Sequence, residues 1–419
     1  MQTKAVRIHG TNDLRLDTFD LPEIADDEIL AAVVSDSVCM STHKAAMQGS
    51  SHKRVPDDVA ENPTIVGHEF CGVIEKVGEK WKDKFAPGEK FAIQPAHNHG
   101  GSLDAPGYSY RFCGGDATHV IIPRETLEED CLLKYSGDAF FYGSLAEPMS
   151  CIIGGAHASY HTKSGSYVHK MGIREGGKLA LLAGAGPMGL GMVDYIVHCD
   201  RKPSLVIVTD IDSARLSRAA SILPPSEAER HGVKLMYVNT TNFEDPIAFM
   251  KRFAPDGFDD VFVYAPVKPV IEMGDKLLGR DGCLNFFAGP TKTDFRAELN
   301  FYNVHYASTH IVGTSGGNTD DMREALRMME DGRLNPAAMI THICGLDAVA
   351  DVTLNLDKIP GGKKLCYTNI SLPLTAISDL EKLGKTDPLM RALAEICGRH
   401  SGLWSAEAEK FLLENAKPI

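Results

Sequence analysis

A glycine-rich turn near the middle of the chain constrains the fold more than any other feature. Residues 178–191 read KLALLAGAGPMGLG, a short apolar run, a glycine turn and the start of a helical stretch. This order matches the dinucleotide-binding fingerprint of a strand, a GxGxxG turn and a helix N-terminus. The sequence therefore predicts a nucleotide-binding fold whose candidate cofactor-binding residues in the turn are Gly184, Gly186, Pro187, Met188 and Gly189.

Each glycine of this turn has a physical reason. Gly184 allows the tight turn, Gly186 lets a pyrophosphate approach the backbone, and Gly189 lets the helix pack closely on the strand. The N–H groups and the dipole of the helix start then favour an anion. The alternative is a glycine-rich turn in an ordinary α/β core, and the strand and helix on either side of the turn disfavour it.

The next apolar run, LVIVTD, ends in an acid at Asp210. That acid lies roughly 20 residues beyond the turn, where a carboxylate binds the adenosine ribose hydroxyls. A carboxylate there repels the 2′-phosphate of NADP(H), so the sequence favours NAD(H). Arg215 lies nearby and could soften this preference.

The pattern along the chain divides it into parts. Residues 1–150 alternate short strands with glycine turns and predict a β-rich body, whereas residues 151–300 alternate strands with helices and predict a doubly wound parallel sheet. Residues 301–370 are expected to return to the first body. Residues 371–419 form an amphipathic helical extension, either an oligomer contact or a packed surface appendage.

Composition narrows the classes of function. A chain of 419 residues with 43% hydrophobic content is long enough for two domains. A net charge of −13 argues against nucleic acid or an anionic membrane as partner. No apolar run is long enough to cross a bilayer, and the first ten residues lack a signal-peptide core. Ten cysteines without a CxxC pair predict reduced thiols in the cytoplasm.

Three separated positions in the first body carry metal-ligand chemistry. They are Cys39, His68 with Glu69 beside it, and Glu147. Cysteine, histidine and carboxylate are ligands that zinc prefers, and a catalytic site uses three of them and leaves one position open. Singly, a cysteine is usually a small buried hydrophobe. Together, ahead of a nucleotide-binding fold, they predict a catalytic zinc next to a hydride source.

The short motifs around these residues resemble those of the zinc-dependent medium-chain dehydrogenases, in their polyol branch. The segments are CMS at 39–41, GHE at 67–69, GGDA at 114–117 and EP at 147–148, and the resemblance covers nearly the whole chain. It implies an α/β protein with a GroES-like β-rich catalytic domain, a Rossmann nucleotide-binding domain and one catalytic zinc. The EP pair would open the helix that leads into the nucleotide-binding domain.

By this resemblance Cys39 and His68 bind zinc, and a carboxylate completes the site. Glu147 is favoured, with Glu69 as the other candidate. Ser41 would carry a proton to or from the zinc-bound oxygen; the alternative is a serine that only caps a turn.

Two departures from the family pattern stand out. The family follows the Ser/Thr with Asp and ends the segment with His, whereas this chain has Thr42, His43 and Lys44. Thr42 can hydrogen-bond but brings no negative charge, and His43 or Lys44 are the candidate ends of the proton relay. Relatives also carry four cysteines in the loop that here spans 96–114, where only Cys113 stands, so a single zinc is predicted.

Four longer stretches read VCMSTHKAAMQG, VPDDVAENPTIVG, QPAHNHGGSLDAPGYSYRF and VGTSGGNTDDMREAL. In these stretches, and along its length, the chain resembles the bacterial L-sorbose 1-phosphate reductases within the family. This implies reduction of a sugar-phosphate ketone, from L-sorbose 1-phosphate to D-glucitol 6-phosphate. A phosphate needs cations, and candidates near Cys39 are Lys44, His52, Lys53 and Arg54. The alternative is that His52, Lys53 and Arg54 are solvated surface groups.

Two rival functions stay open at this point. One is a dehydrogenase of free polyols such as sorbitol, or of galactitol 1-phosphate. The other is a catalytically silent nucleotide-binding structural protein, which the intact ligand set disfavours. A homo-oligomer, dimer or tetramer, is expected in either case.

Overall fold

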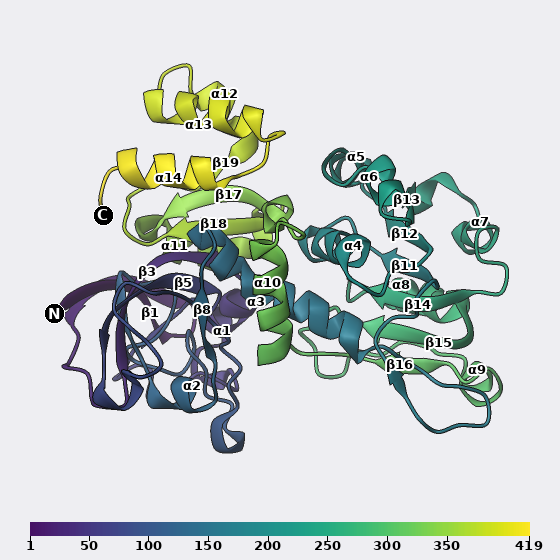
Figure 1. Cartoon of the computed structure of the whole chain (residues 1–419), viewed down its shortest axis with the longest axis horizontal. Helices are drawn as coiled ribbons and strands as arrows, with labels where there is room; N and C mark the ends of the chain where they lie inside the picture. Colours follow the sequence, from purple (N-terminus) through teal and green to yellow (C-terminus); the bar gives the residue numbers. More distant parts are fainter. The chain divides into compact units, whose positions relative to one another are not determined.

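The computed structural model describes all 419 residues, which form two compact units (Figure 1). The first unit comprises Met1–Pro148, Asn318–Gly332 and Ile340–Ile419. The second comprises Met149–Gly317 and Arg333–Met339. The chain therefore leaves the first unit, builds the second and returns.

The second unit is built on a six-stranded sheet in the order β13-β12-β11-β14-β15-β16. All of its pairings are parallel. The strands are β11 (Lys178–Leu182), β12 (Leu205–Asp210), β13 (Lys234–Asn239), β14 (Phe258–Val263), β15 (Leu278–Phe286) and β16 (His310–Val312). The order reverses between β11 and β14, which is the switch point where doubly wound folds bind ligands at the carboxyl ends of the strands. The predicted doubly wound sheet is confirmed.

The helices of the second unit follow its strands. They are α4 (Pro187–His198), α5 (Ser213–Ile222), α6 (Pro225–Arg230), α7 (Pro246–Lys251), α8 (Lys268–Leu277) and α9 (Phe301–Tyr306). All six residues of β12 are buried. This is why LVIVTD reads as an unbroken apolar run rather than an alternating one: the strand is covered on both faces. A short hairpin, β9 (Tyr160–His161) and β10 (Lys170–Met171), precedes the sheet.

The second unit extends beyond residue 300, where the sequence analysis expected it to end. The cause is β16, which adds to β15 in parallel with Cys283 opposite His310. A strand of three residues, HIV, gives no apolar run that sequence patterns detect. The return to the first unit begins at Asn318, just before α10 (Thr319–Glu330).

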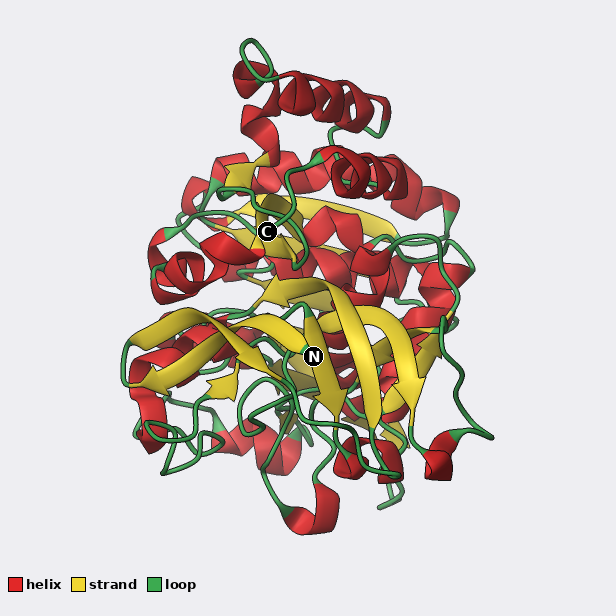
Figure 2. Ribbon diagram, turned by 90° about the vertical axis from the view of Figure 1, so that its left-hand side faces the viewer, coloured by secondary structure: helices red, strands yellow, loops and turns green.

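The first unit contains an eight-stranded sheet in the order β19-β17-β18-β3-β5-β6-β8, with β7 also pairing with β3, and a three-stranded sheet in the order β2-β1-β4 (Figure 2). The strands are β1 (Gln2–Gly10), β2 (Asp13–Asp20), β3 (Ile29–Val38), β4 (Thr64–Ile65), β5 (Phe70–Val77), β6 (Lys90–Ile93), β7 (His119–Ile122), β8 (Leu132–Tyr135), β17 (Ile340–Gly345), β18 (Lys363–Tyr367) and β19 (Thr375–Ala376). Strand β18 returns from late in the chain to pair antiparallel with β3, with Lys364 opposite Val38. The β-rich first body is confirmed.

The first unit's helices lie between and after these strands. They are α1 (Met40–Gln48), α2 (Arg124–Glu128), α3 (Phe140–Ala158), α10, α11 (Val349–Leu354), α12 (Leu380–Leu383), α13 (Pro388–Arg399) and α14 (Ala406–Asn415). Helix α3 begins in the first unit and continues into the second. Pro148 lies inside this helix and does not open it. The expectation that EP opens the helix is therefore wrong, because the helix begins two turns earlier with apolar residues that precede the motif.

The C-terminal extension packs on the first unit. Trp404 is 1% exposed, and its indole Nε1 donates a hydrogen bond to the Tyr367 hydroxyl on β18 at 2.7 Å. Leu412 on α14 is fully buried. These contacts make the extension part of the first unit's core. No helix of the structure has both the length and the apolar character that a membrane crossing requires. None of the ten cysteines forms a disulfide.

Candidate active site

The sheet of the first unit brings three of the four candidate zinc ligands together: Cys39, His68 and Glu69. Cys39 follows β3 and is the N-cap residue of α1, while His68 and Glu69 directly precede β5. Strands β3 and β5 pair antiparallel, so the end of one lies beside the start of the other. One ligand atom from each of Cys39, His68 and Glu69 lies within 4.8 Å of the others.

Hydrogen bonds fix the ring of His68. Its Nδ1 lies 3.1 Å from the Thr42 hydroxyl, and its Nε2 lies 3.2 Å from the Ser41 hydroxyl and 3.3 Å from the Tyr108 hydroxyl. The Ser41 hydroxyl also donates to Cys39 Sγ at 3.1 Å. Burial lowers the pKa of His68 to about 4, so the imidazole is neutral, which is the form that binds a metal.

The thiol of Cys39 is held in its protonated form by its surroundings. Burial is the main cause that raises the pKa of the Cys39 thiol to about 12, and the charge of Glu69 is the second. A divalent cation is the group that reverses this, because a coordinating thiol is deprotonated by the metal's own charge. A sulfur, a neutral imidazole and a carboxylate with ligand atoms within 4.8 Å of one another are a donor set that fits zinc.

Glu69 is engaged by a buried lysine. Lys363 Nζ lies 2.5 and 2.6 Å from the two carboxylate oxygens, and the Ser37 hydroxyl donates to Oε2 at 2.5 Å. Burial alone would raise the pKa of Glu69, but the charges of Lys363 and His68 and the hydrogen bonds from Lys363 and Ser37 together outweigh it and hold this pKa below its ordinary value. Both carboxylate oxygens are therefore already used.

Glu147 lies in the first-unit part of α3 and is 9% exposed. Its charge raises the pKa values of both Cys39 and Lys363, as one of the smaller contributions after burial and Glu69. The Glu147 carboxylate therefore lies near the predicted ligand cluster, but it is not one of the three groups whose ligand atoms lie within 4.8 Å of one another.

The two predicted relay ends, His43 and Lys44, lie differently. His43 is buried, and its ring Nδ1 donates to the carbonyl of Thr353 on α11 at 2.8 Å. None of its hydrogen bonds reaches Ser41, so its contact anchors α1 on α11. Lys44 lies one residue further along α1, where its charge acts on His52.

Tyr108 connects the predicted zinc ligands to a group of basic residues. Its ring centroid lies 4.9 Å from that of His68, and it also hydrogen-bonds Ser41. The His52 ring stacks on Tyr108 at 5.8 Å, and the Arg54 guanidinium carbon lies 5.6 Å from the tyrosine ring centroid.

We call Lys44, His52 and Arg54 the cation group. Burial lowers the pKa of His52, and the charges of Arg54, Lys53 and Lys44 add to this effect. The charge of Arg54 also reaches His68. Lys53 itself is exposed. The structure thus places Lys44, His52 and Arg54 of the four proposed residues near one another, and the lowered pKa of His52 favours its neutral form.

Sequence reasoning missed Tyr108, Lys363 and Ser37. Tyr108 lies in a polar loop with no periodic pattern, so no signal marked it. Lys363 offered one signal, a lysine at the start of a strand whose five residues are all buried. A buried charge needs a partner, but nothing in the sequence identified Glu69 as that partner.

In the second unit, the glycine turn has the geometry that a phosphate site needs. A Cβ at Gly189 would lie 2.0 Å from the carbonyl oxygen of Gly184, so only glycine fits there. A Cβ at Gly186 would meet nothing within 4 Å. Helix α4 begins at Pro187, directly after this open position, and Met188 is its second residue. The exposed N–H groups of that helix start can receive an anion.

Asp210 ends β12 beside the same turn, because the Gly184 backbone N–H donates to the carbonyl of Thr209 at 2.8 Å. The Asp210 carboxylate accepts the N–H groups of Ile211 at 2.8 Å and Asp212 at 3.0 Å through Oδ1. Arg215 lies in the first turn of α5, with its guanidinium 3.6 Å from the Asp212 carboxylate.

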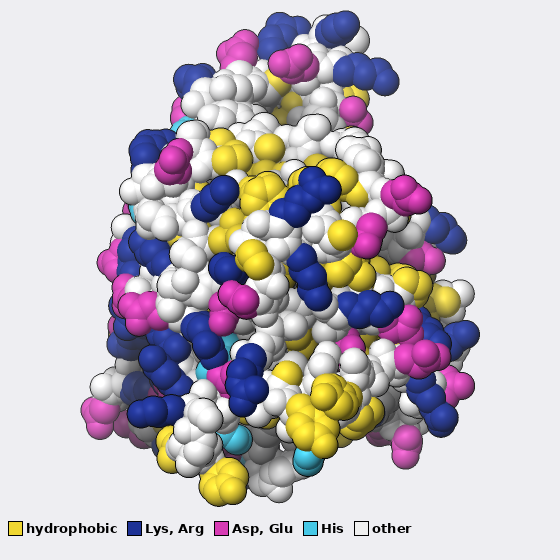
Figure 3. Space-filling view, turned by 90° about the vertical axis from the view of Figure 1, so that its right-hand side faces the viewer, with side chains coloured by type: hydrophobic (Ala, Val, Ile, Leu, Met, Phe, Trp, Pro, Cys, Tyr) yellow, Lys and Arg dark blue, Asp and Glu magenta, His cyan; other side chains and the backbone are white.

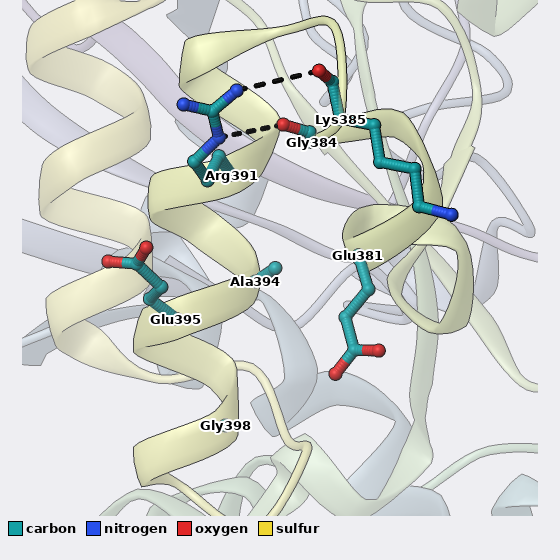
Figure 4. Close-up of a pocket in the computed structure, with 7 residues that line it drawn as sticks. All are labelled: Glu381, Gly384, Lys385, Arg391, Ala394, Glu395 and Gly398. Carbon is teal, nitrogen blue, oxygen red and sulfur yellow. Dashed lines mark hydrogen bonds between the residues drawn. The ribbon is translucent and has the colours of Figure 1, made fainter.

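A separate hollow of about 420 Å³ lies in the C-terminal extension between α12 and α13 (Figure 4). Arg391 points across it and donates to the carbonyl oxygens of Gly384 at 2.8 Å and Lys385 at 3.5 Å. No predicted catalytic, metal or cofactor residue lines it. This hollow is therefore apart from the chemistry described above.

Comparison with known proteins identifies the family of the chain. Residues 25–171 match the alcohol dehydrogenase GroES-like domain. The chain is 53% identical to the mannitol-1-phosphate 5-dehydrogenase of Aliivibrio fischeri, over 99% of this chain and 98% of that protein. It is 48% identical to the L-sorbose 1-phosphate reductase of Klebsiella pneumoniae, over 100% and 98%.

Among solved structures, the 2R,3R-butanediol dehydrogenase of Bacillus subtilis superposes with a TM-score of 0.70 at 20% identity, covering 88% of this chain and 100% of that one. The chain belongs to the zinc-dependent medium-chain dehydrogenases, in the polyol branch. It is an enzyme of the polyol and sugar-phosphate dehydrogenase type.

Proposed function

We propose that the protein interconverts a ketose phosphate and a hexitol phosphate with a nicotinamide cofactor, and that it reduces L-sorbose 1-phosphate to D-glucitol 6-phosphate. The observation that carries this proposal is the position of the cation group beside the predicted zinc ligands, with the ring of Tyr108 between them. A substrate carbonyl at the metal ligands and a phosphate at the cations would then belong to one molecule.

Cys39, His68 and Glu147 would hold the zinc ion. Glu69 is the less suitable ligand because Lys363 and Ser37 already bind its oxygens. When bound, zinc supplies Lewis-acid polarisation of the ketone, and the nicotinamide supplies the hydride. Thr42 holds the His68 ring through Nδ1, which leaves Nε2 for the metal.

Ser41 would deliver the proton that the reduced carbonyl oxygen needs. Its hydroxyl touches both Cys39 Sγ and His68 Nε2, so it lies beside the reacting oxygen. The Tyr108 hydroxyl is its hydrogen-bonded neighbour and can pass a proton on. His43, bonded to Thr353, is less suited to end this relay; Lys44 is better suited to the phosphate.

For the cofactor, the glycine turn would bind the pyrophosphate and Asp210 the adenosine ribose. A carboxylate at this position favours NAD(H) over NADP(H). Arg215 is 56% exposed at its side chain and is only loosely paired with Asp212, so it could turn toward a 2′-phosphate.

A second candidate substrate is mannitol 1-phosphate, favoured by the 53% identity to the mannitol-1-phosphate 5-dehydrogenase. Both candidates are phosphorylated six-carbon polyols or ketoses, so the cation group suits both. The choice between these two substrates depends on the stereochemistry of their hydroxyl groups. The cation group would bind the phosphate and does not distinguish that stereochemistry.

We also infer a homo-oligomer, assembled through the second unit. Strand β16 is the free edge of its sheet, and exposed aromatic side chains lie just before it: Phe301 is 72% exposed and Tyr302 68%. Hydrophobic side chains gather between charged ones on the face drawn in Figure 3. Light scattering should give a mass above that of one chain, and Phe301→Asp should lower it.

The function is tested by zinc content together with initial rates on four substrates: L-sorbose 1-phosphate, free L-sorbose, mannitol 1-phosphate and sorbitol. We expect about one zinc in the first unit and turnover of a phosphorylated substrate only. Equal rates on free L-sorbose would overturn the phosphate assignment. Binding of NADH with neither zinc nor turnover would indicate a silent nucleotide-binding protein instead.

A further inference from the structure

A second group of metal-ligand side chains lies in the second unit, away from any residue used above. His198 is the last residue of α4, Glu227 lies in α6, and His231 is the C-cap residue of α6. One ligand atom from each of the three lies within 4.8 Å of the others. A tetrahedral ion with bonds of about 2.1 Å holds its ligands about 3.4 Å apart, so small side-chain movements would bring these atoms onto one ion.

The ring of His198 is already oriented. Its Nδ1 contacts Asp194 twice: it lies 2.9 Å from the backbone carbonyl oxygen of Asp194 and 3.0 Å from the carboxylate oxygen Oδ1 of the same residue. Asp194 is buried, and its other carboxylate oxygen accepts the backbone N–H of Asn335 at 2.8 Å. Nδ1 therefore carries the proton in the neutral ring, and Nε2 carries the lone pair. A carboxylate behind a histidine in this way is the arrangement found behind metal-bound histidines.

Glu227 and His231 are paired one helical turn apart. Glu227 Oε1 lies 3.3 Å from His231 Nε2, and the rings of His231 and His198 approach edge to face with centroids 4.5 Å apart. The other oxygen of Glu227 faces Arg230, whose side chain is 71% exposed. Arg230 pairs with Oε2 and leaves Oε1 on the histidine side.

We propose that His198, Glu227 and His231 bind a divalent transition metal ion such as zinc, cobalt or nickel. Two imidazoles and a carboxylate suit this class of ion. Asp194 is a positioning residue that holds His198. The fourth coordination position stays open for water. The ion joins the end of α4 to the end of α6, and α4 is the helix whose start follows the glycine turn.

This site contains no sulfur and belongs to the second unit, so it is independent of the zinc site proposed for the first unit. It also adds a metal to the single zinc that the sequence predicted. It lies outside the loop 96–114, where the family's additional cysteines would stand.

The test is equilibrium dialysis of the full chain, stripped with EDTA, against cobalt chloride, with the bound metal measured by mass spectrometry. His231→Ala and His198→Ala should each bind one equivalent less than the wild type. Asp194→Asn should lower the affinity of this site for cobalt about 10- to 100-fold. His305→Ala, an exposed histidine elsewhere in the second unit, is the matched control and should bind as much as the wild type.

The test compares the bound cobalt of each variant with that of the wild type. This difference is the same whether or not the first unit also binds a metal ion. Circular dichroism and NADH binding check that each variant is folded. His231 is the more exposed histidine, so if His198→Ala does not fold, the result for His231→Ala tests the proposal. Cobalt binding by His231→Ala equal to that of the wild type would overturn the proposal. Unchanged affinity in a folded Asp194→Asn would remove the positioning role.

Discussion

The ammonium of Lys363 lies between the two carboxylate oxygens of Glu69, 2.5 and 2.6 Å from them, with both residues buried. Lys363 begins strand β18 and Glu69 directly precedes β5, so the two residues are far apart in the sequence. Their ion pair holds a negative charge directly beside the predicted zinc ligands, where an unpaired carboxylate would otherwise be unstable.

Removing Lys363 should therefore destabilise the first unit. Lys363→Met leaves Glu69 as a buried charge without its partner, which costs about 3–5 kcal/mol. Urea unfolding followed by circular dichroism measures this. The double variant Lys363→Met with Glu69→Gln should recover part of the loss, and Lys358→Met, an exposed lysine nearby, should change little. If Lys363→Met unfolds at the same urea concentration as the wild type, the ion pair does not stabilise the fold.

Cys39→Ser and His68→Ala should each remove the zinc of the first unit and nearly all activity. Each leaves an incomplete set of ligands, and the Lewis acid is worth several kcal/mol at the transition state. Zinc is measured by mass spectrometry on protein freed of loose metal. His99→Ala, a partly exposed histidine that pairs with Glu129, is the control and should keep its zinc. Full zinc in both ligand variants would place the metal elsewhere.

Arg54→Ala and Lys44→Ala should raise KM for the sugar phosphate by about tenfold or more, because a charge-assisted hydrogen bond to phosphate is worth about 1.5–3 kcal/mol. The rate on a free ketose and the zinc content should stay the same. Lys53→Ala is the matched control, since Lys53 is exposed. If kcat falls for both substrates when Lys44 is replaced, Lys44 ends the proton relay. Unchanged KM in both variants contradicts the phosphate site.

Asp210→Ala should weaken use of NADH and improve use of NADPH. The carboxylate stands at the end of β12 beside the glycine turn, where it would bind the ribose hydroxyls and repel a 2′-phosphate. The ratio of kcat/KM for the two cofactors is the measurement. Asp210→Asn keeps an acceptor for the N–H groups of Ile211 and Asp212, so it separates loss of charge from loss of the local turn. An unaltered ratio in both variants removes Asp210 from the ribose site.

The buried Glu409 should give the stability a pH dependence. Burial raises the pKa of Glu409 to about 7. The backbone N–H groups of Phe140 and Phe141 and the Tyr367 hydroxyl donate hydrogen bonds to the carboxylate, and these bonds oppose the increase. Because the folded pKa exceeds the ordinary value of about 4.5, the folded state holds this proton more tightly. The resulting stability is present below about pH 4.5 and is lost as pH rises through about 7.

Glu409→Gln cannot lose that proton, so its free energy of unfolding should rise relative to the wild type between pH 5 and 8, by up to about 3 kcal/mol. Paired urea titrations of the two proteins at several pH values measure the difference. Glu407→Gln, an exposed neighbour, is the control. A constant difference between wild type and Glu409→Gln across this range would show that Glu409 does not titrate there.

The sequence predicted those parts of the fold that local patterns encode. The glycine turn and its flanking apolar runs gave β11, β12 and α4 nearly residue for residue, because a buried parallel strand is an apolar run and a close helix–strand contact requires glycine. It missed β16, since three residues carry no pattern. It misplaced the start of α3, since Pro148 is tolerated inside that helix.

Of the candidate site, the sequence predicted residues whose chemistry is unusual in themselves, such as Cys39 and His68, which the structure brings together. It could not predict Lys363 or Tyr108. Their importance comes only from neighbours that the folded sheet supplies, and a lysine or tyrosine by itself carries no record of its partner. The roles of all these residues in zinc binding and catalysis stay predictions until the experiments above are done.

The pairing of β18 with β3 also determines the order in which the two units can complete their folding during synthesis. Strand β3 emerges early, but its neighbour β18 is made only after the whole second unit has been synthesised. The second unit, begun later, can therefore complete its sheet first, although nascent domains commonly fold from the N-terminus onward. Until then the second half of β3, residues 35–38, lacks its β18 partner, whereas β7 can already pair with the first half. Unpaired strand edges are where newly made chains pair wrongly, so the first unit should set the chaperone demand during synthesis.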